Sequence, residues 1–192
     1  RAEQDIRKLS TDDFCVTNLR QANVYGLSRK MRLDLAVNGM TAGLFKNGKL
    51  NILRDGSQWR PFVHIKDTSR AFIMAMEAEK DRVNGEVLNV GSDEQNYQII
   101  RLAEDVCLAL DVPLDLAWYG EVDQRDYRVS FRKIRETLGF LPKFTPADGA
   151  REVMAALRDK TLDPTDPRWN IANWYAKLAD TFKLQTVEVK PY

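Results

Sequence analysis

The sequence predicts an α/β fold, because short apolar runs alternate with longer segments that carry apolar residues at helical spacing. Residues 87–91 read Val-Leu-Asn-Val-Gly, which is typical of a strand in a parallel sheet covered on both faces. Residues 97–110 follow as a helix, with Ile99, Leu102 and Val106 on its apolar face. This strand and helix are the clearest pair, and we expect similar pairs on either side of them.

The elements before this pair are expected in a fixed order. They are a helix over residues 2–9, a strand over 14–19, a helix over 31–44, a strand over 50–53, an extended segment over 59–65 and a helix over 66–79. Asp55-Gly56 is a strong turn signal after the second strand. Pro61 disfavours helix at the residue before it, which favours the extended segment.

The elements after the pair are mainly helical. They are a short strand over residues 114–118 and helices over 130–138, 146–157 and 166–182. Thr145 can cap the helix that begins at Pro146, since proline suits the first helical position. Asp148 carries a negative charge at the positive end of the helix dipole.

Composition excludes several classes of protein. The 192 residues include 29 Lys plus Arg and 28 Asp plus Glu, with 44% hydrophobic residues, so the chain is globular and close to neutral. Nucleic-acid binders usually carry a strong basic excess, and no apolar run approaches the ~20 residues of a membrane span. Cys15 and Cys107 both have apolar neighbours, which predicts buried free thiols and a cytoplasmic protein.

No self-sufficient catalytic set is evident in the sequence. His64 is the sole histidine, which excludes a metal site built from several histidines. Its place in Phe62-Val63-His64-Ile65 predicts a satisfied, partly buried histidine. The sequence contains no Gly-x-Gly-x-x-Gly and no phosphate-binding Gly-Lys-Ser/Thr.

The remaining candidates are asparagine and arginine side chains. Asn23 follows the first strand, where ligands bind in open parallel sheets. Arg60 lies in the extended segment. Arg125 begins a basic stretch, residues 125–135, that contains five lysine or arginine residues and a single acid, Asp126. Guanidinium groups bind phosphate oxygens through paired hydrogen bonds, so two converging arginines suit a diphosphate. The alternative is that these arginines are merely solvated surface residues.

Four segments together carry a resemblance to a known family. They are Arg20-Gln-Ala-Asn-Val-Tyr-Gly26, Asp55-Gly-Ser-Gln-Trp-Arg-Pro-Phe-Val-His-Ile-Lys-Asp67, Gly85-Glu-Val-Leu-Asn-Val-Gly91, and Arg125 followed by Lys133-Ile134 and Leu138-Gly139-Phe140. In this order and spacing they resemble the C-terminal part of an extended short-chain dehydrogenase/reductase. The group is that of the NAD-dependent nucleotide-sugar epimerases and dehydratases.

The resemblance implies both a fold and a set of binding residues. Residues 1–27 would be a remnant of a Rossmann-type parallel sheet with the substrate loop. Residues 28–192 would mainly form a small mixed α/β substrate-binding domain, with residues 62–91 contributing back to the Rossmann sheet. The residues implied to bind are Asn23, Asn38, Arg60 and Arg125 for the diphosphate or sugar of a nucleotide-diphosphate sugar, Leu53 for its base, and Gln21 and Val24 for the nicotinamide of NAD or NADP.

The departures from the family concern catalysis. The glycine-rich cofactor loop and the catalytic Tyr-x-x-x-Lys are not in the sequence; Tyr25 is followed four positions later by Arg29. Hydride transfer to NAD(P) in this family needs a tyrosinate and a lysine, so we assign no catalytic residue. Ser130 also stands where relatives often carry an acid.

These departures lead to an expectation about the whole protein. We expect a fragment, or one half of a split protein, that is inactive alone and pairs with an N-terminal Rossmann half, and a homodimer is possible. The alternatives are a non-catalytic dinucleotide sensor of the same fold, a protein-binding module, and a reductase of small carbonyl compounds.

Overall fold

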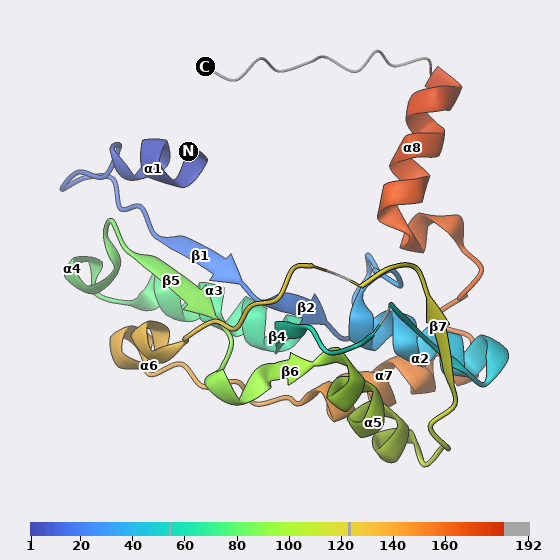
Figure 1. Cartoon of the computed structure of the whole chain (residues 1–192). Coiled ribbons are helices and arrows are strands. Elements are labelled where there is room, and N and C mark those ends of the chain that lie inside the picture. The colour runs from blue at the N-terminus through green and yellow to red at the C-terminus, as the bar shows by residue number, and fades with distance from the viewer. Residues whose placement is uncertain (54, 123, 183–192) are drawn as a thin grey trace.

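The computed structural model describes residues 1–53, 55–122 and 124–182, and Figure 1 shows its elements in order. The α-helices are α1 (Ala2–Arg7), α2 (Ala36–Asn47), α3 (Ile65–Glu77), α4 (Lys80–Val83), α5 (Ile99–Leu110), α6 (Arg132–Leu138), α7 (Pro146–Arg158) and α8 (Ile171–Phe182). The strands are β1 (Asn18–Gln21), β2 (Asn23–Tyr25), β3 (Leu50–Leu53), β4 (Trp59–His64), β5 (Val87–Val90), β6 (Asn96–Gln98) and β7 (Leu116–Tyr119). Two 3-10 helices are η1 (Asp93–Gln95) and η2 (Pro167–Trp169).

The strands form three small sheets with mainly parallel pairing. β1 pairs with β5 and β3 pairs with β7, both in parallel. Between them, β4 pairs in parallel with β2 and antiparallel with β6. The predicted α/β fold is therefore confirmed, with β4 bonded on both sides at the centre of the molecule (Figure 1).

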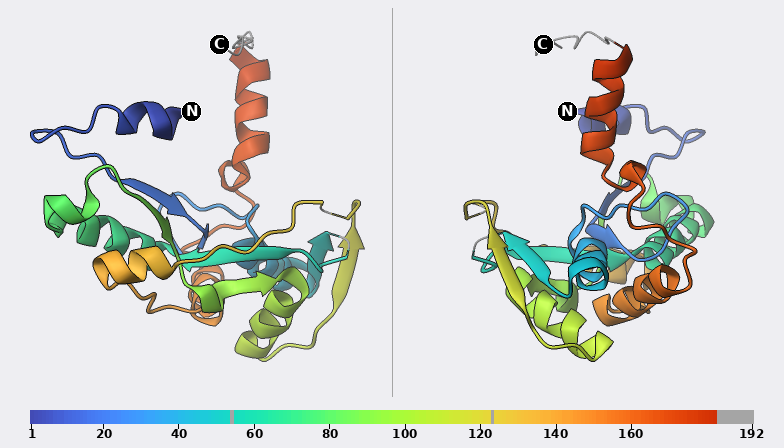
Figure 2. Two further views of the ribbon diagram at one scale, coloured as in Figure 1. Left: turned by 60° about the vertical axis from the view of Figure 1, so that its left-hand side comes forward. Right: turned by 90° about the vertical axis from the view of Figure 1, so that its right-hand side faces the viewer.

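Helices cover the sheets and bury two main cores. One core lies among α2, α5 and α7 and the central strands, and its most buried members include Tyr25, Val37, Leu50, Phe62 and Leu102. The other lies between the β1–β5 pair and helices α3 and α6, and it includes Leu88, Val90, Phe131, Ile134 and Phe140. In contrast, α1 and α8 bury no residue, and Figure 2 shows α8 standing apart from the body.

Some predicted boundaries are wrong, and the contacts explain why. The strand expected from residue 14 begins at Asn18, because the Val16 N–H donates to the side chain of Asn84 instead of to a neighbouring strand. Cys15 lies in this stretch and is exposed, so the prediction of two buried thiols holds only for Cys107. The helix expected from Met31 begins at Ala36, since Met31 is buried in a loop against α7 rather than on a helical face. Strands β2 and β6 were not predicted.

The two-unit division of the chain stays a prediction. Residues 183–192 of the second predicted unit lie outside the described residues. Within the described ranges, no helix has the length and apolar character that crossing a bilayer requires.

A buried carboxylate fixes the segment that leads into α7. Both oxygens of Asp67 accept the Lys143 N–H at 2.9 Å, one accepts the Phe144 N–H at 3.0 Å, and Arg70 Nη2 donates to the other at 2.8 Å. The helix then starts as predicted, with a reciprocal capping box between Thr145 and Asp148 and proline at its first position. This start places Glu152 of α7 beneath the central strand.

His64 connects β4, α3 and α7; it is a satisfied histidine as predicted, but it is fully rather than partly buried. Its side chain is 1% exposed and stacks on Phe144 with ring centroids 4.6 Å apart. Nδ1 accepts the Lys66 N–H at 3.1 Å, and Nε2 lies 3.1 Å from Glu152 Oε2. Since Nδ1 is an acceptor, the neutral ring carries its proton on Nε2 and donates it to Glu152.

We predict that the stability of the fold decreases as the pH falls below the ordinary histidine pKa of about 6.5. Burial lowers the pKa of His64, although the Glu152 carboxylate opposes the shift. The unfolded chain then binds a proton that the folded chain resists, so acid favours unfolding. Urea unfolding between about pH 5 and 8 should show this slope. A His64→Asn variant should show a flatter slope, and equal slopes in the two proteins would contradict the prediction.

Candidate functional site

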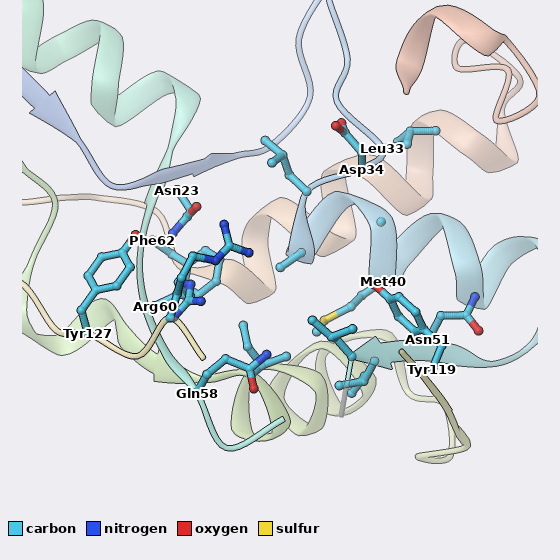
Figure 3. Close-up of a pocket in the computed structure, with 17 residues that line it drawn as sticks. Asn23, Leu33, Asp34, Met40, Asn51, Gln58, Arg60, Phe62, Tyr119 and Tyr127 are labelled. Atoms are coloured by element: carbon cyan, nitrogen blue, oxygen red, sulfur yellow. The ribbon is translucent and has the colours of Figure 1, made fainter. Parts of the chain in front are cut away.

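One cleft, which we call the main cleft because predicted residues line it, lies between the start of α2, the ends of β3 and β7, and the start of β4 (Figure 3). Its volume is about 520 Å³. Among the residues that line it are Asn23, Leu35, Leu53, Arg60, Arg125 and Tyr127. Four of the residues predicted from the sequence, namely Asn23, Leu53, Arg60 and Arg125, therefore meet in one cleft.

Asn23 occupies the centre of the site. It is the first residue of β2, opposite Phe62, and it lines the main cleft and two smaller hollows beside it. Its Nδ2 donates to the Pro61 carbonyl at 2.9 Å, which fixes the side-chain amide against β4. Figure 3 shows the amide oxygen directed away from β4. The group is thus oriented to accept a hydrogen bond from a hydroxyl of a ligand.

Arg60 is a buried cation in the wall of the cleft. The residue is 8% exposed, its Nη1 donates to the Trp59 carbonyl at 2.6 Å, and its guanidinium lies 5.0 Å from the centre of the Tyr127 ring. Arg125 is two residues before Tyr127 and lines the same cleft. Two guanidinium groups at one cleft fit a ligand with two neighbouring phosphates.

The second hollow, of about 410 Å³, contains the other predicted residues Gln21, Val24 and Asn38. Asn38 is 3% exposed, and both ends of its amide bond to the loop after β2. Its Oδ1 accepts the Gly26 N–H at 2.9 Å, and its Nδ2 donates to the Arg32 carbonyl at 3.2 Å. Asn38 thus holds the loop, and its role as a ligand for substrate stays a prediction.

An ion pair stands between the main cleft and this second hollow. Arg32 lines the hollow and donates to both oxygens of Asp34, at 2.8 and 2.7 Å, while Asp34 lines the cleft. The hydrogen bonds from Arg32 hold the pKa of Asp34 below its usual range. The carboxylate is therefore an acceptor at neutral pH and is unsuited to donate a proton.

Several residues that line the main cleft were not identified from the sequence, although the spacing from a predicted arginine could have indicated two of them. Gln58 and Tyr127 each lie two positions from a predicted arginine in an extended segment, and residues at that spacing share one side of the chain. Gln58 is 6% exposed, and within the described ranges its Oε1 has no hydrogen-bond partner. Asp34 and Tyr119 had no such signal, because they depend on how α2 and β7 pack.

The chain is similar to known proteins of one family. Residues 2–91 match the sequence profile of the NAD dependent epimerase/dehydratase family. Over these residues the chain is similar to that family. The sequence is 28% identical over 161 residues to a UDP-N-acetyl-alpha-D-glucosaminuronate decarboxylase of Bacillus cytotoxicus, covering 75% of this chain and 46% of that protein. The resemblance predicted from the four segments is confirmed.

Solved structures of such enzymes share the fold. A UDP-glucuronic acid 4-epimerase from Bacillus cereus, in complex with UDP-glucuronic acid and NAD, has a TM-score of 0.66 at 22% identity, covering 77% of this chain and 46% of that one. RMD from Pseudomonas aeruginosa, complexed with NADPH, has a TM-score of 0.68 at 20% identity, and the match covers 83% of this chain and 54% of that one. The chain thus spans about half the length of the relatives it matches.

We predict that Asn38→Leu destabilises the fold by about 1–3 kcal/mol, because the buried Gly26 N–H loses its acceptor. The measurement is the free energy of unfolding in urea. Asn47→Leu, at the exposed end of the same helix, is the matched control and should change stability little. An unchanged stability in Asn38→Leu would show that the loop does not depend on this amide.

Proposed function

We propose that this chain is the substrate-binding part of an NAD(P)-dependent nucleotide-sugar epimerase or dehydratase, and that its main cleft binds the diphosphate of the sugar nucleotide. The observation that carries the proposal is that Arg60, a buried cation, and Arg125 line one cleft. Guanidinium groups bind phosphate oxygens through paired hydrogen bonds, so two of them at one cleft suit a diphosphate.

The rest of the cleft accommodates the other parts of such a ligand. Leu53 ends β3 opposite Tyr119, and both line the cleft, so a base can lie against apolar and aromatic surface there. Asn23 stands at the junction with the two smaller hollows, where its oxygen can accept a hydrogen bond from a sugar hydroxyl. The UDP-glucuronic acid bound in the B. cereus relative is a ligand of this chemical class.

NAD(P) would contact this chain through its nicotinamide end. Gln21 ends β1 and Val24 lies in β2, and both line the second hollow at the carboxyl edge of the strands, as the nicotinamide position requires. When bound, the cofactor supplies a hydride acceptor and donor. Relatives bind NAD in one case and NADPH in another, so we propose either for this chain.

We also propose that a Rossmann half completes the protein. β5 covers one edge of β1, and no described strand pairs with the other edge. Apolar side chains in the residues that lead into β1 are exposed, among them Leu9 at 59% and Phe14 at 56%. A strand and helix from the other half of the family fold would cover them. A homodimer stays a prediction, and the alternative function is a dinucleotide sensor or protein-binding module of the same fold.

The proposed diphosphate site predicts a loss of binding in arginine variants. Arg60→Ala and Arg125→Ala should each weaken binding of UDP or GDP about ten- to a hundredfold, as expected for hydrogen bonds to charged groups. Arg60→Lys should lose part of this, because an ammonium cannot match the planar guanidinium. Isothermal titration calorimetry measures the change. Arg101→Ala, on the exposed side of α5, is the control. Unchanged affinity in both cleft variants would refute the proposal.

The open edge of β1 predicts self-association of the chain when it is purified alone. Exposed apolar groups beside an unpaired strand favour contact between copies. Light scattering should therefore show oligomers, and Phe14→Asp should reduce them. A monodisperse, protease-resistant monomer of the unaltered chain would contradict this prediction.

A further inference from the structure

Two chain segments meet at the cleft through crossed arginine and aromatic pairs. The Arg60 guanidinium lies 5.0 Å from the centre of the Tyr127 ring, and the Arg128 guanidinium lies 4.7 Å from the Trp59 ring. Each segment thus supplies one arginine and one aromatic residue. We call these four residues, Trp59, Arg60, Tyr127 and Arg128, the arginine–aromatic interlock.

Backbone hydrogen bonds keep the two segments in register. The Trp59 N–H donates to Asp126 Oδ1 at 2.8 Å, and the Tyr127 N–H donates to the Trp59 carbonyl at 3.4 Å. The same carbonyl accepts from Arg60 Nη1 at 2.6 Å. The Trp59 carbonyl therefore accepts hydrogen bonds from both the Arg60 side chain and the Tyr127 backbone, which holds the two close to each other.

Stacking on a ring suits an arginine that must bind an anion. All the N–H donors of a guanidinium lie in its plane, so a ring against its face occupies none of them. The ring also attracts the cation and limits its rotation. Tyr127 is 47% exposed and lines both the main cleft and a neighbouring hollow, whereas Arg60 is 8% exposed. The ring is thus the outer wall that covers the buried cation.

We infer that Tyr127 is a positioning residue for the diphosphate: its ring holds the Arg60 guanidinium so that the in-plane donors stay directed at a ligand in the cleft. The inference rests on the proposed function, since it presumes that Arg60 binds the ligand. It goes further, because it states that the contribution of Arg60 to the affinity for the ligand depends on the Tyr127 side chain, which lies on a separate segment. Because Tyr127 follows Arg125 by two residues and its ring contacts Arg60, the arginine–aromatic interlock also relates the positions of the two cleft arginines.

The test compares Tyr127→Leu with Tyr127→Phe in the full chain. Tyr127→Leu removes the ring and should weaken UDP or GDP binding about three- to tenfold, because Arg60 must then be ordered by the ligand. Tyr127→Phe keeps the ring and should bind within about twofold of the unaltered chain. Tyr175→Leu is the matched control, since that tyrosine also faces a cation, Lys30, at 5.9 Å and is 55% exposed.

A second variant separates positioning from direct contact. In an Arg60→Met background, Tyr127→Leu should change the affinity less than about twofold, because the ring has no guanidinium left to hold. An equal loss in both backgrounds would show that Tyr127 contacts the ligand itself and would overturn the inference. So would a Tyr127→Leu variant that binds as tightly as the unaltered chain.

A ligand-free readout completes the design. The Nε–H resonance of Arg60 should carry a ring-current shift that Tyr127→Phe keeps and Tyr127→Leu removes. If Arg60→Met and Arg125→Ala both leave nucleotide binding unchanged, the proposed function fails. If Arg60→Met weakens binding and Tyr127→Leu does not, the positioning role alone fails.

Discussion

The burial of one guanidinium is the constraint on which the site depends. Removing an ion from water costs several kcal/mol even after the protein relaxes, so a cation that is 8% exposed has to be compensated. The Trp59 carbonyl and the Tyr127 ring supply part of that compensation to Arg60. These two contacts come from separate segments of the chain, so the position of the guanidinium depends on how the two segments pack.

The strand that carries Arg60 is held more firmly than any other in the described chain. β4 is bonded by β2 on one side and β6 on the other. Its Pro61 carbonyl orients Asn23, and its last residue, His64, joins α3 and α7 through Lys66 and Glu152. A shift of β4 would therefore disturb the core and the site together. The positions of the candidate binding residues on β2 and β4 are therefore set by the packing of these strands.

The sequence could predict this much because the signals were local. The fold class, the capped start of α7 and the buried His64 follow from short patterns, and Asn23, Leu53, Arg60 and Arg125 were found from motifs and do meet in one cleft. The errors arise where distant contacts decide. Met31 has helical spacing but packs as a loop residue against α7. Residues 14–17 look like a strand, yet the Val16 N–H bonds to the Asn84 side chain instead of to a strand. Tyr127 stacks on a residue 67 positions away.

In the proposed function, the group that the cleft binds, the diphosphate, is separate from the sugar, where the reaction takes place. A diphosphate does not react in an epimerase or dehydratase, so contacts to it bind ground state and transition state alike and cannot by themselves raise kcat. Their value lies in holding the sugar at a fixed distance from the reacting groups, which replaces a bimolecular encounter by a preset geometry. That benefit requires rigid arginines, because a mobile grip would leave the sugar free to move. If the cleft holds a diphosphate as proposed, the contact of Arg60 with the Tyr127 ring and the pairing of β4 on both sides would keep the bound group in a fixed position.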